Sequence, residues 1–123
     1  MKKILFVVLC CLCLVGCEKN WKKDFQVSDI KIKVIDNWND SNTYITYTIK
    51  NVSNYTCNSM KAIVEFKSGN LTVEETIYPP IFSSNPLKPN STITDEDVIS
   101  HKDYEGYTAT MKYIDCYDKS TNN

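Results

Sequence analysis

The chain of 123 residues has no arginine, one histidine and three glycines, and each shortage argues against a class of function. Arginine is the usual bidentate partner of phosphate and carboxylate groups, so its absence removes the clamp on which many anion-binding sites depend. All 14 basic residues are lysine and face 15 acidic residues, whereas a nucleic-acid-binding surface requires a basic stripe. Glycines at positions 16, 69 and 106 alone do not build a phosphate-binding loop. We therefore expect no nucleic-acid partner and no cofactor.

The few residues that could support catalysis or metal binding are poorly arranged for it. The single histidine, His101, lies in the polar stretch SHKDYEG, and no nucleophile elbow accompanies it, so no Ser-His-Asp triad is indicated. The acidic run Asp95, Glu96, Asp97 lacks the alternating oxygen ligands and the glycine of an EF-hand loop. On a strand, Asp95 and Asp97 share one face and Glu96 points away, which favours a solvated edge that discourages strand addition. We predict a protein that is not an enzyme and holds no metal.

Four of the six cysteines lie in the first 17 residues, in a segment with the layout of an export signal. Residues 4–15 are an unbroken run of twelve apolar residues, preceded by two lysines and followed by a glycine. Crossing a bilayer takes about 20 apolar residues, so this run is too short for an ordinary membrane span. Cys10, Cys11 and Cys13 are interpreted as small hydrophobic residues of a signal-peptide helix that is discarded.

The end of this segment, Leu14-Val15-Gly16-Cys17, resembles the lipobox of bacterial lipoproteins. In that family the cysteine is acylated with a diacylglyceryl group and the chain is cut just before it. The resemblance implies a signal peptide over residues 1–16, lipid attachment at Cys17, and an extracytoplasmic location on the cell membrane or the outer membrane. Two or more acyl chains hold a protein firmly on a membrane. The alternatives are an ordinary cleaved signal with a chance cysteine, or an uncleaved short anchor.

Residues 17–24 show no periodicity and are predicted to be a lipidated tether. Lys19, Lys22 and Lys23 are close enough to the lipid to meet anionic headgroups, and a solvated linker explains them equally well. Without Lys2 and Lys3, the mature chain carries 12 lysines against 15 acids, a balance near minus three.

From Phe25 onward, apolar and polar residues alternate with the period of half-buried strands. The turn formers NWNDSN at residues 37–42 separate the first two strands, Ser68-Gly69-Asn70 predicts a hairpin, and a weaker strand is expected from Ser91 to about Ile99. About six or seven antiparallel strands need two packed layers, which predicts an all-β sandwich over residues 25–118, followed by a disordered tail at 119–123. The inward-facing positions are expected to be Ile30, Ile32, Val34, Ile45, Tyr47, Ile49, Ala62, Val64, Phe66, Tyr107, Ala109, Met111 and Tyr113.

Three stretches, ITYTIKNVSNYTCNSMKAIVEFKSGN, LKPNSTITDEDVI and YTATMKYID, resemble the Ig-like modules of small bacterial lipoproteins. Asn90 stands where such modules usually carry glycine. The resemblance implies an Ig-like antiparallel β-sandwich that binds or assembles without catalysis, with an unidentified envelope protein or glycan as its partner. Fold analogy alone does not name that ligand.

A second functional hypothesis is an inhibitor or immunity-type lipoprotein that blocks a specific enzyme or toxin at the membrane. Such a protein needs an exposed loop with an anchor side chain, and Trp38 within NWNDSN is the best candidate.

Two cysteines, Cys57 and Cys116, remain in the mature domain, and outside the reducing cytosol a disulfide between them is expected. The alternative is a pair of free thiols, of which a reactive one would need a nearby base or cation. Cys116 has the parity of the outward residues Thr110 and Lys112, and Cys57 has the parity of Lys61. The pattern therefore predicts a peripheral disulfide, at a strand end or on an outer face.

Several tyrosines do not fit the inward parity of the strands. They either line a recognition surface, where tyrosine is enriched, or pack across strands on a half-exposed sheet. These residues are Tyr44, Tyr55, Tyr78, Tyr104 and Tyr117.

Overall fold

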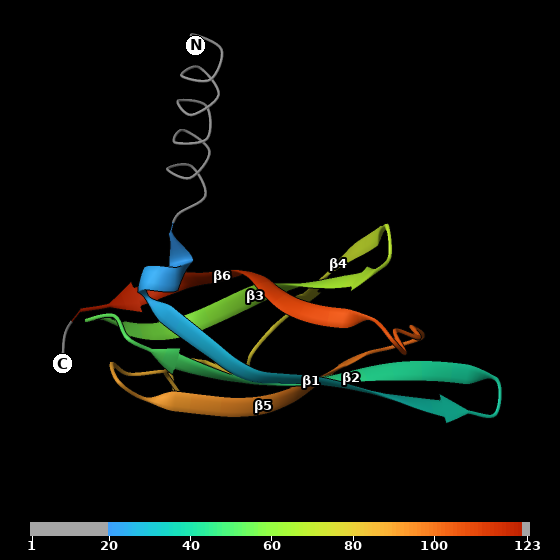
Figure 1. Cartoon of the computed structure of the whole chain (residues 1–123). Helices are drawn as coiled ribbons and strands as arrows, with labels where there is room; N and C mark the ends of the chain where they lie inside the picture. The colour runs from blue at the N-terminus through green and yellow to red at the C-terminus, as the bar shows by residue number, and fades with distance from the viewer. Residues whose placement is uncertain (1–19, 122–123) are drawn as a thin grey trace, which may run out of the picture.

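Residues 20–121 are described by the computed structural model, and they form two three-stranded antiparallel sheets (Figure 1). The arrangement is all-β and consistent with a β-sandwich, which confirms the fold class predicted from the alternating pattern. The predicted signal-peptide helix and the lipid-attachment residue Cys17 lie outside the described residues. Within the described part, no helix is long and apolar enough to cross a membrane. The strands are β1 (Phe25–Asn37), β2 (Asp40–Asn51), β3 (Thr56–Ser68), β4 (Leu71–Ile77), β5 (Thr92–Ile99) and β6 (Thr108–Ser120).

The sheets have the strand orders β1-β2-β5 and β4-β3-β6, so β2 and β3 are the central strands. Central strands are covered on both edges, and their inward residues are the most deeply buried of the domain. The predicted inward residues of β2 and β3 are all fully buried, and additional core residues come from the β4–β5 connection. These core residues include Ile45, Tyr47, Ile49, Ala62, Val64, Phe66, Ile81 and Leu87.

Two predicted turns are present as tight hairpins. β1 and β2 are joined by the two residues Trp38 and Asn39, since Asn37 pairs with Asp40. β3 and β4 are joined by Gly69 and Asn70, and Gly69 has a φ of +60°, a conformation that glycine adopts at little cost. The turn-forming run at 37–42 is thus mostly strand, because only its second and third residues leave the ladder.

The chain is fixed to the domain from Trp21 onward. Trp21–Lys23 form a short 3-10 helix, η1, within the region expected as a tether. The Trp21 indole Nε1 donates a hydrogen bond of 2.9 Å to the Lys112 carbonyl of β6, and its ring packs against the core. The described part of the predicted tether is therefore held on the domain, and η1 fixes the entry of β1 against β6.

The inward pattern predicted for β6 is wrong beyond Met111. Tyr113 was expected to face the core, but Ile114 is the buried residue, 2% exposed. Ile63 pairs with Tyr113 and its neighbour Val64 pairs with Met111, so Lys112 is an extra residue on β6. Such a bulge reverses the inward and outward alternation of every following residue.

β6 also continues beyond the predicted end of the domain. Lys119 and Ser120, assigned to the tail from sequence, pair with Cys57 and Thr56 at the start of β3. The ladder with β3 extends the strand over residues whose composition alone is typical of a polar terminus.

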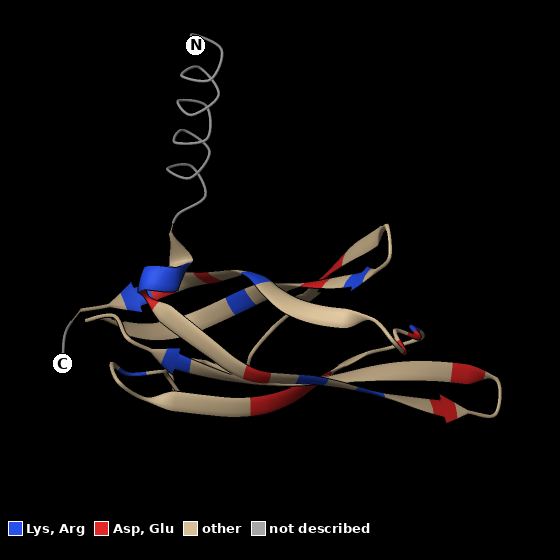
Figure 2. Cartoon of the chain, in the orientation of Figure 1, with Lys and Arg blue, Asp and Glu red and all other residues tan. Residues whose placement is uncertain are grey.

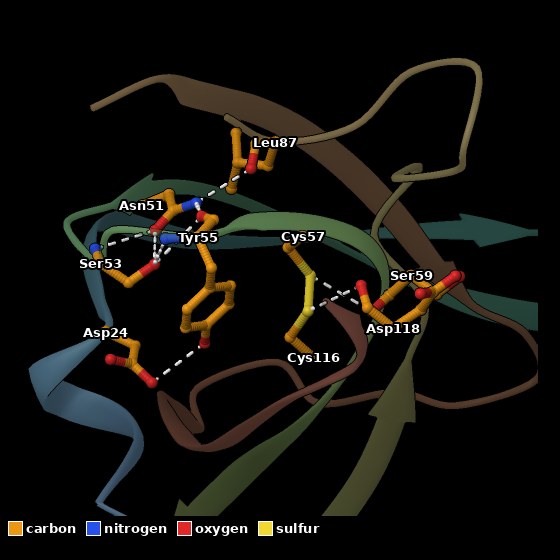
Figure 3. Close-up of a disulfide and its surroundings, with 9 residues drawn as sticks. All are labelled: Asp24, Asn51, Ser53, Tyr55, Cys57, Ser59, Leu87, Cys116 and Asp118. Carbon is orange, nitrogen blue, oxygen red and sulfur yellow. Dashed lines mark hydrogen bonds between the residues drawn. A yellow bond between two sulfur atoms is a disulfide. The ribbon is translucent and has the colours of Figure 1, made fainter. Parts of the chain in front are cut away.

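Two buried polar side chains, both on β2, hold the connections between the sheets. At the end of β2, the Asn51 amide donates to the carbonyls of Tyr55 and Leu87 at 2.8 and 2.9 Å (Figure 3). Its oxygen accepts from the Ser53 backbone N–H at 2.9 Å and from the Ser53 hydroxyl at 2.6 Å. The Asn51 backbone adds bonds to Asn90 and Ser91, so one residue joins the β2–β3 turn to the β4–β5 connection.

Thr43 has the same role near the other end of β2. Its hydroxyl donates to the Lys102 carbonyl at 2.9 Å and accepts from the Tyr104 backbone N–H at 3.0 Å. Thr43 is fully buried, and a buried hydroxyl is stable only when its hydrogen-bonding capacity is used. The β5–β6 connection is therefore tied to β2.

We predict that Asn51→Ala lowers the free energy of unfolding by about 3 kcal/mol, because buried backbone groups lose their partners at two connections at once. Asn54→Ala is the matched control, since Asn54 is an exposed asparagine of the same turn and its truncation is expected to cost no more than about 0.5 kcal/mol. Denaturant unfolding of both variants measures the difference. Equal, small losses in the two variants would show that the Asn51 network does not stabilise the domain.

Candidate functional site

Trp38 is the most exposed large hydrophobic residue in residues 20–121, with 96% of its surface accessible. It lies at the tip of the β1–β2 hairpin, which projects at the end of the molecule opposite η1 (Figure 1). Aromatic residues are usually buried on folding, and a solvated tryptophan on a short turn gives up that stabilisation. The structure thus places the residue expected in an exposed loop at the tip of a two-residue turn.

The hairpin is braced next to its turn by the β5–β6 connection. His101 Nδ1 lies 2.6 Å from Asp40 Oδ2, and the His101 backbone N–H donates to the Asn42 side chain at 2.9 Å. Ser41 donates its hydroxyl to Asp36 across the two strands. An exposed ion pair adds little stability, but these contacts fix the direction of the hairpin. His101 is exposed, as expected from its polar loop, and its partner Asp40 was not foreseen.

Apolar side chains continue from the hairpin onto the outer face of the β1-β2-β5 sheet. Ile35 and Val98 are 40% and 49% exposed, and Tyr44 pairs with Val98 in the ladder. We call the residues Ile35, Trp38, Tyr44 and Val98 the distal patch. The outward position of Ile35 could be predicted from the sequence, because Ile35 shares the outward parity of Lys31 and Lys33. No pattern joined it to Val98, which comes from a distant strand.

The distal patch has an acidic surround. Asp36 and Asp40 lie on the two strands of the hairpin, and Asp103 and Glu105 lie in the β5–β6 connection (Figure 2). The ammonium group of Lys33 lies over the Tyr44 ring, 5.7 Å from its centre, so a partner that covers the patch would meet apolar surface, this one cation and acidic side chains around them.

The acidic run of β5 is only partly the solvated edge that its sequence suggested. β5 is an edge strand and Glu96 is exposed, but Asp95 and Asp97 face the other sheet and are half-buried. Tyr47 donates its hydroxyl to Asp97 at 2.7 Å. Inward-pointing charges on an edge strand oppose pairing with another chain. In residues 20–121, no group of three histidine, cysteine or acidic side chains is close enough to hold a metal ion.

Burial changes the ionisation of this pair. Desolvation raises the pKa of Asp97, the hydrogen bond from Tyr47 opposes that shift, and the charge of Asp95 adds to it. Desolvation together with the nearby Asp97 also raises the pKa of Tyr47, which therefore stays a hydrogen-bond donor.

Cys57 and Cys116 form the expected disulfide, which links β3 to β6 within one sheet (Figure 3). The disulfide is buried and not on an outer face, because Cys57 is fully buried and Cys116 is 6% exposed, although Cys57 lies at a strand end, the start of β3, as one of the two predicted positions had it. The β3–β6 register shifts around Ser59, and it shifts again at Lys112, so both cysteines turn inward. Neither sulfur is a free thiol, and the geometry gives no support to a reactive cysteine at either position.

The tyrosines that did not fit the inward parity do not share a face. Tyr55 and Tyr104 are 9% and 5% exposed and belong to the core, where they donate hydroxyl protons to Asp24 and Glu75. Tyr78 and Tyr117 border a shallow hollow beside Lys61 and Asp115 on the β4-β3-β6 sheet. Tyr44 lies on the opposite sheet, so a single tyrosine-lined surface is absent from the described part of the chain.

Comparison with known proteins gives no match to a family model, to a curated protein or to a solved structure. The function is therefore inferred from the chain's own residues.

The raised pKa of Asp97 predicts a pH-dependent effect of Asp97→Asn. Because the folded state holds this proton more tightly than the unfolded chain, ionisation of Asp97 lowers stability as the pH rises. The variant should gain stability relative to the wild type between about pH 4 and pH 7.

Glu96→Gln on the same strand is the control, since Glu96 is exposed, and its relative stability should change little over this range. Denaturant unfolding at the two pH values measures both variants. A relative stability of Asp97→Asn that falls towards neutral pH would mean that the ionised carboxylate stabilises the fold through Tyr47.

Proposed function

We propose that the chain is a membrane-anchored lipoprotein of the bacterial cell envelope, whose Ig-like domain binds a partner through the distal patch and catalyses no reaction. The observation that carries this proposal is Trp38, which is 96% exposed on a braced hairpin. Interface energy is concentrated in a few aromatic anchors, and a rigid anchor loses little entropy on binding. The partner is an envelope protein or a glycan.

The strand order supports the Ig-like assignment. In Ig domains one sheet contains strands A, B and E, and the other contains C and F, with C′ added next to C in the variable type. The orders β1-β2-β5 and β4-β3-β6 correspond to A-B-E and C′-C-F. The disulfide differs, since it joins β3 and β6 of one sheet, where antibody domains bridge the two sheets through strands B and F.

The position of the hairpin supports a role at the membrane surface. Lipid at Cys17 would hold the domain near η1, and β1 runs from η1 to the distal patch over 13 residues. At about 3.3 Å per residue, the strand carries the patch roughly 40 Å from its first residue. An anchored domain would thus present Trp38 on the side away from its attachment.

The hypothesis of an inhibitor or immunity-type protein is also supported by the hairpin. A narrow, projecting turn with one apolar side chain at its tip fits a concave surface, such as the entrance of an enzyme cleft or a toxin site. The stoichiometric recovery of one enzyme or toxin would favour this form of binding over envelope assembly.

We predict that Trp38→Ala weakens capture of the partner from envelope extract by about 30-fold, the effect of an interface hot spot of about 2 kcal/mol. The acylated protein, which begins at Cys17, serves as bait, and intact mass confirms the lipid on Cys17. Tyr117→Ala is the control, since Tyr117 is a 59% exposed aromatic residue of the other sheet. Equal capture by both variants and the wild type would rule out Trp38 as the anchor.

A further inference from the structure

We propose that the end of the domain next to η1 docks on anionic lipid headgroups through a cluster of lysines, which deepens the proposed function and rests on its lipid anchor. The partner is a negatively charged bilayer surface, and the contact sets the orientation of the domain. The cluster, called the proximal lysines, consists of Lys22, Lys23, Lys50, Lys88 and Lys119.

These lysines come from distant parts of the sequence and are brought together by the strand register. Lys50 pairs with Gln26 at the start of β1, and Lys119 pairs with Cys57 at the start of β3. Lys88 follows Leu87, which forms a bridge with Cys57. The blue segments at the η1 end of Figure 2 show this convergence of η1, β2, β6 and the β4–β5 connection.

The charges of the proximal lysines point to solvent. All five residues are exposed, and the ammonium groups of Lys22 and Lys119 lie over the rings of Trp21 and Tyr55, 5.8 and 4.8 Å from the ring centres. Ring contacts position a cation without neutralising it. Of these five lysines in residues 20–121, only Lys23 has a carboxylate within ion-pair distance, Asp24 at 3.5 Å.

Acidic residues at this end are few and partly engaged. Asp24 accepts the Tyr55 hydroxyl at 3.0 Å in addition to its contact with Lys23. On β6, Asp118 is exposed, and the charge of Asp115 reaches Tyr55 and helps to raise the pKa of that tyrosine, after burial and Asp24. At the opposite end, the four acidic residues around the distal patch are accompanied by three exposed lysines, Lys33, Lys67 and Lys102. The η1 end is therefore the more positive of the two ends, and a negative surface attracts it more strongly than the other.

A hollow of about 900 Å³, lined by both polar and apolar residues, lies at this end, between the β2–β3 turn and the β4–β5 connection. None of the described residues that line it is acidic. Its hydroxyl, amide and ammonium groups can donate hydrogen bonds to phosphate oxygens, and Asn51 holds its two rims together. The polar residues of the lining are Ser53, Asn54, Thr56, Lys88, Asn90 and Ser120.

The anchor would hold this end within reach of the bilayer. Three residues separate Cys17 from Trp21, and four extended steps span at most about 14 Å. The attraction of lysines to an anionic leaflet acts over a Debye length of about 8–10 Å. A tether of this length therefore brings the proximal lysines into the surface potential.

The test is lysine footprinting, in vesicles, of the acylated protein that begins at Cys17. An amine-acetylating reagent is applied to protein in phosphatidylcholine vesicles and in phosphatidylcholine vesicles that contain phosphatidylglycerol, and mass spectrometry gives the labelling rate of each lysine. Lys50, Lys88 and Lys119 should label several-fold more slowly in the anionic vesicles, and high salt should restore their rates. Lys33, Lys67 and Lys102 are the internal control and should label equally in both vesicles.

A charge-matched pair of variants completes the test. The triple variant Lys50→Gln, Lys88→Gln, Lys119→Gln should lose the salt-sensitive protection of Lys22 and Lys23, whereas Lys33→Gln, Lys67→Gln, Lys102→Gln should keep it. Acylated protein with equal labelling in both vesicle types overturns the lipid-docking inference alone. A Cys17 without lipid, found by intact mass before reconstitution, overturns the anchor proposal and this inference with it.

Discussion

Two buried polar side chains on one strand determine how the sheets are joined. Asn51 and Thr43 both lie on the inner face of β2, and between them they bond to all three connections that pass from one sheet to the other. An apolar core pulls two sheets together without fixing their connections, since the hydrophobic effect has no direction. Hydrogen bonds from buried groups are directional, and each unmet one is costly. The domain therefore has two ends of defined shape.

The two ends have different chemistry. Near η1, Asn51 joins the two rims of a hollow that Lys88 lines, and near the β5–β6 connection Thr43 and His101 support the hairpin that exposes Trp38. A lipid at Cys17 would use this difference between the two ends to orient the domain, with the η1 end facing lipid headgroups and the distal patch facing a partner. The buried disulfide reinforces the β3–β6 ladder beneath the first end, and closing a loop over a separation of 59 residues stabilises the fold by about 4 kcal/mol in the chain-entropy model.

Alternation in the sequence was sufficient to predict the all-β class, the inward faces of β2 and β3, and the hairpin at Gly69. It failed where the ladder is irregular. An extra residue such as Lys112 reverses the inward and outward alternation of the residues that follow, and the residue types do not indicate where such a bulge occurs. The buried positions of Ile114, Cys57 and Cys116 follow from such bulges.

The sites depend on long-range pairing that a single sequence does not reveal. The exposure of Trp38 could be expected from its turn. The Asp40–His101 contact, the Ile35–Val98 part of the distal patch and the convergence of the proximal lysines join segments far apart in the chain.

The central claim is that the anchored domain is oriented with its proximal lysines against the membrane and the distal patch away from it. Neutron reflectometry of the acylated protein on a supported anionic bilayer measures the thickness of the protein layer. We predict roughly 40 Å, set by the length of β1, and a layer of roughly 20 Å, the thickness of two packed sheets lying flat, would contradict the account.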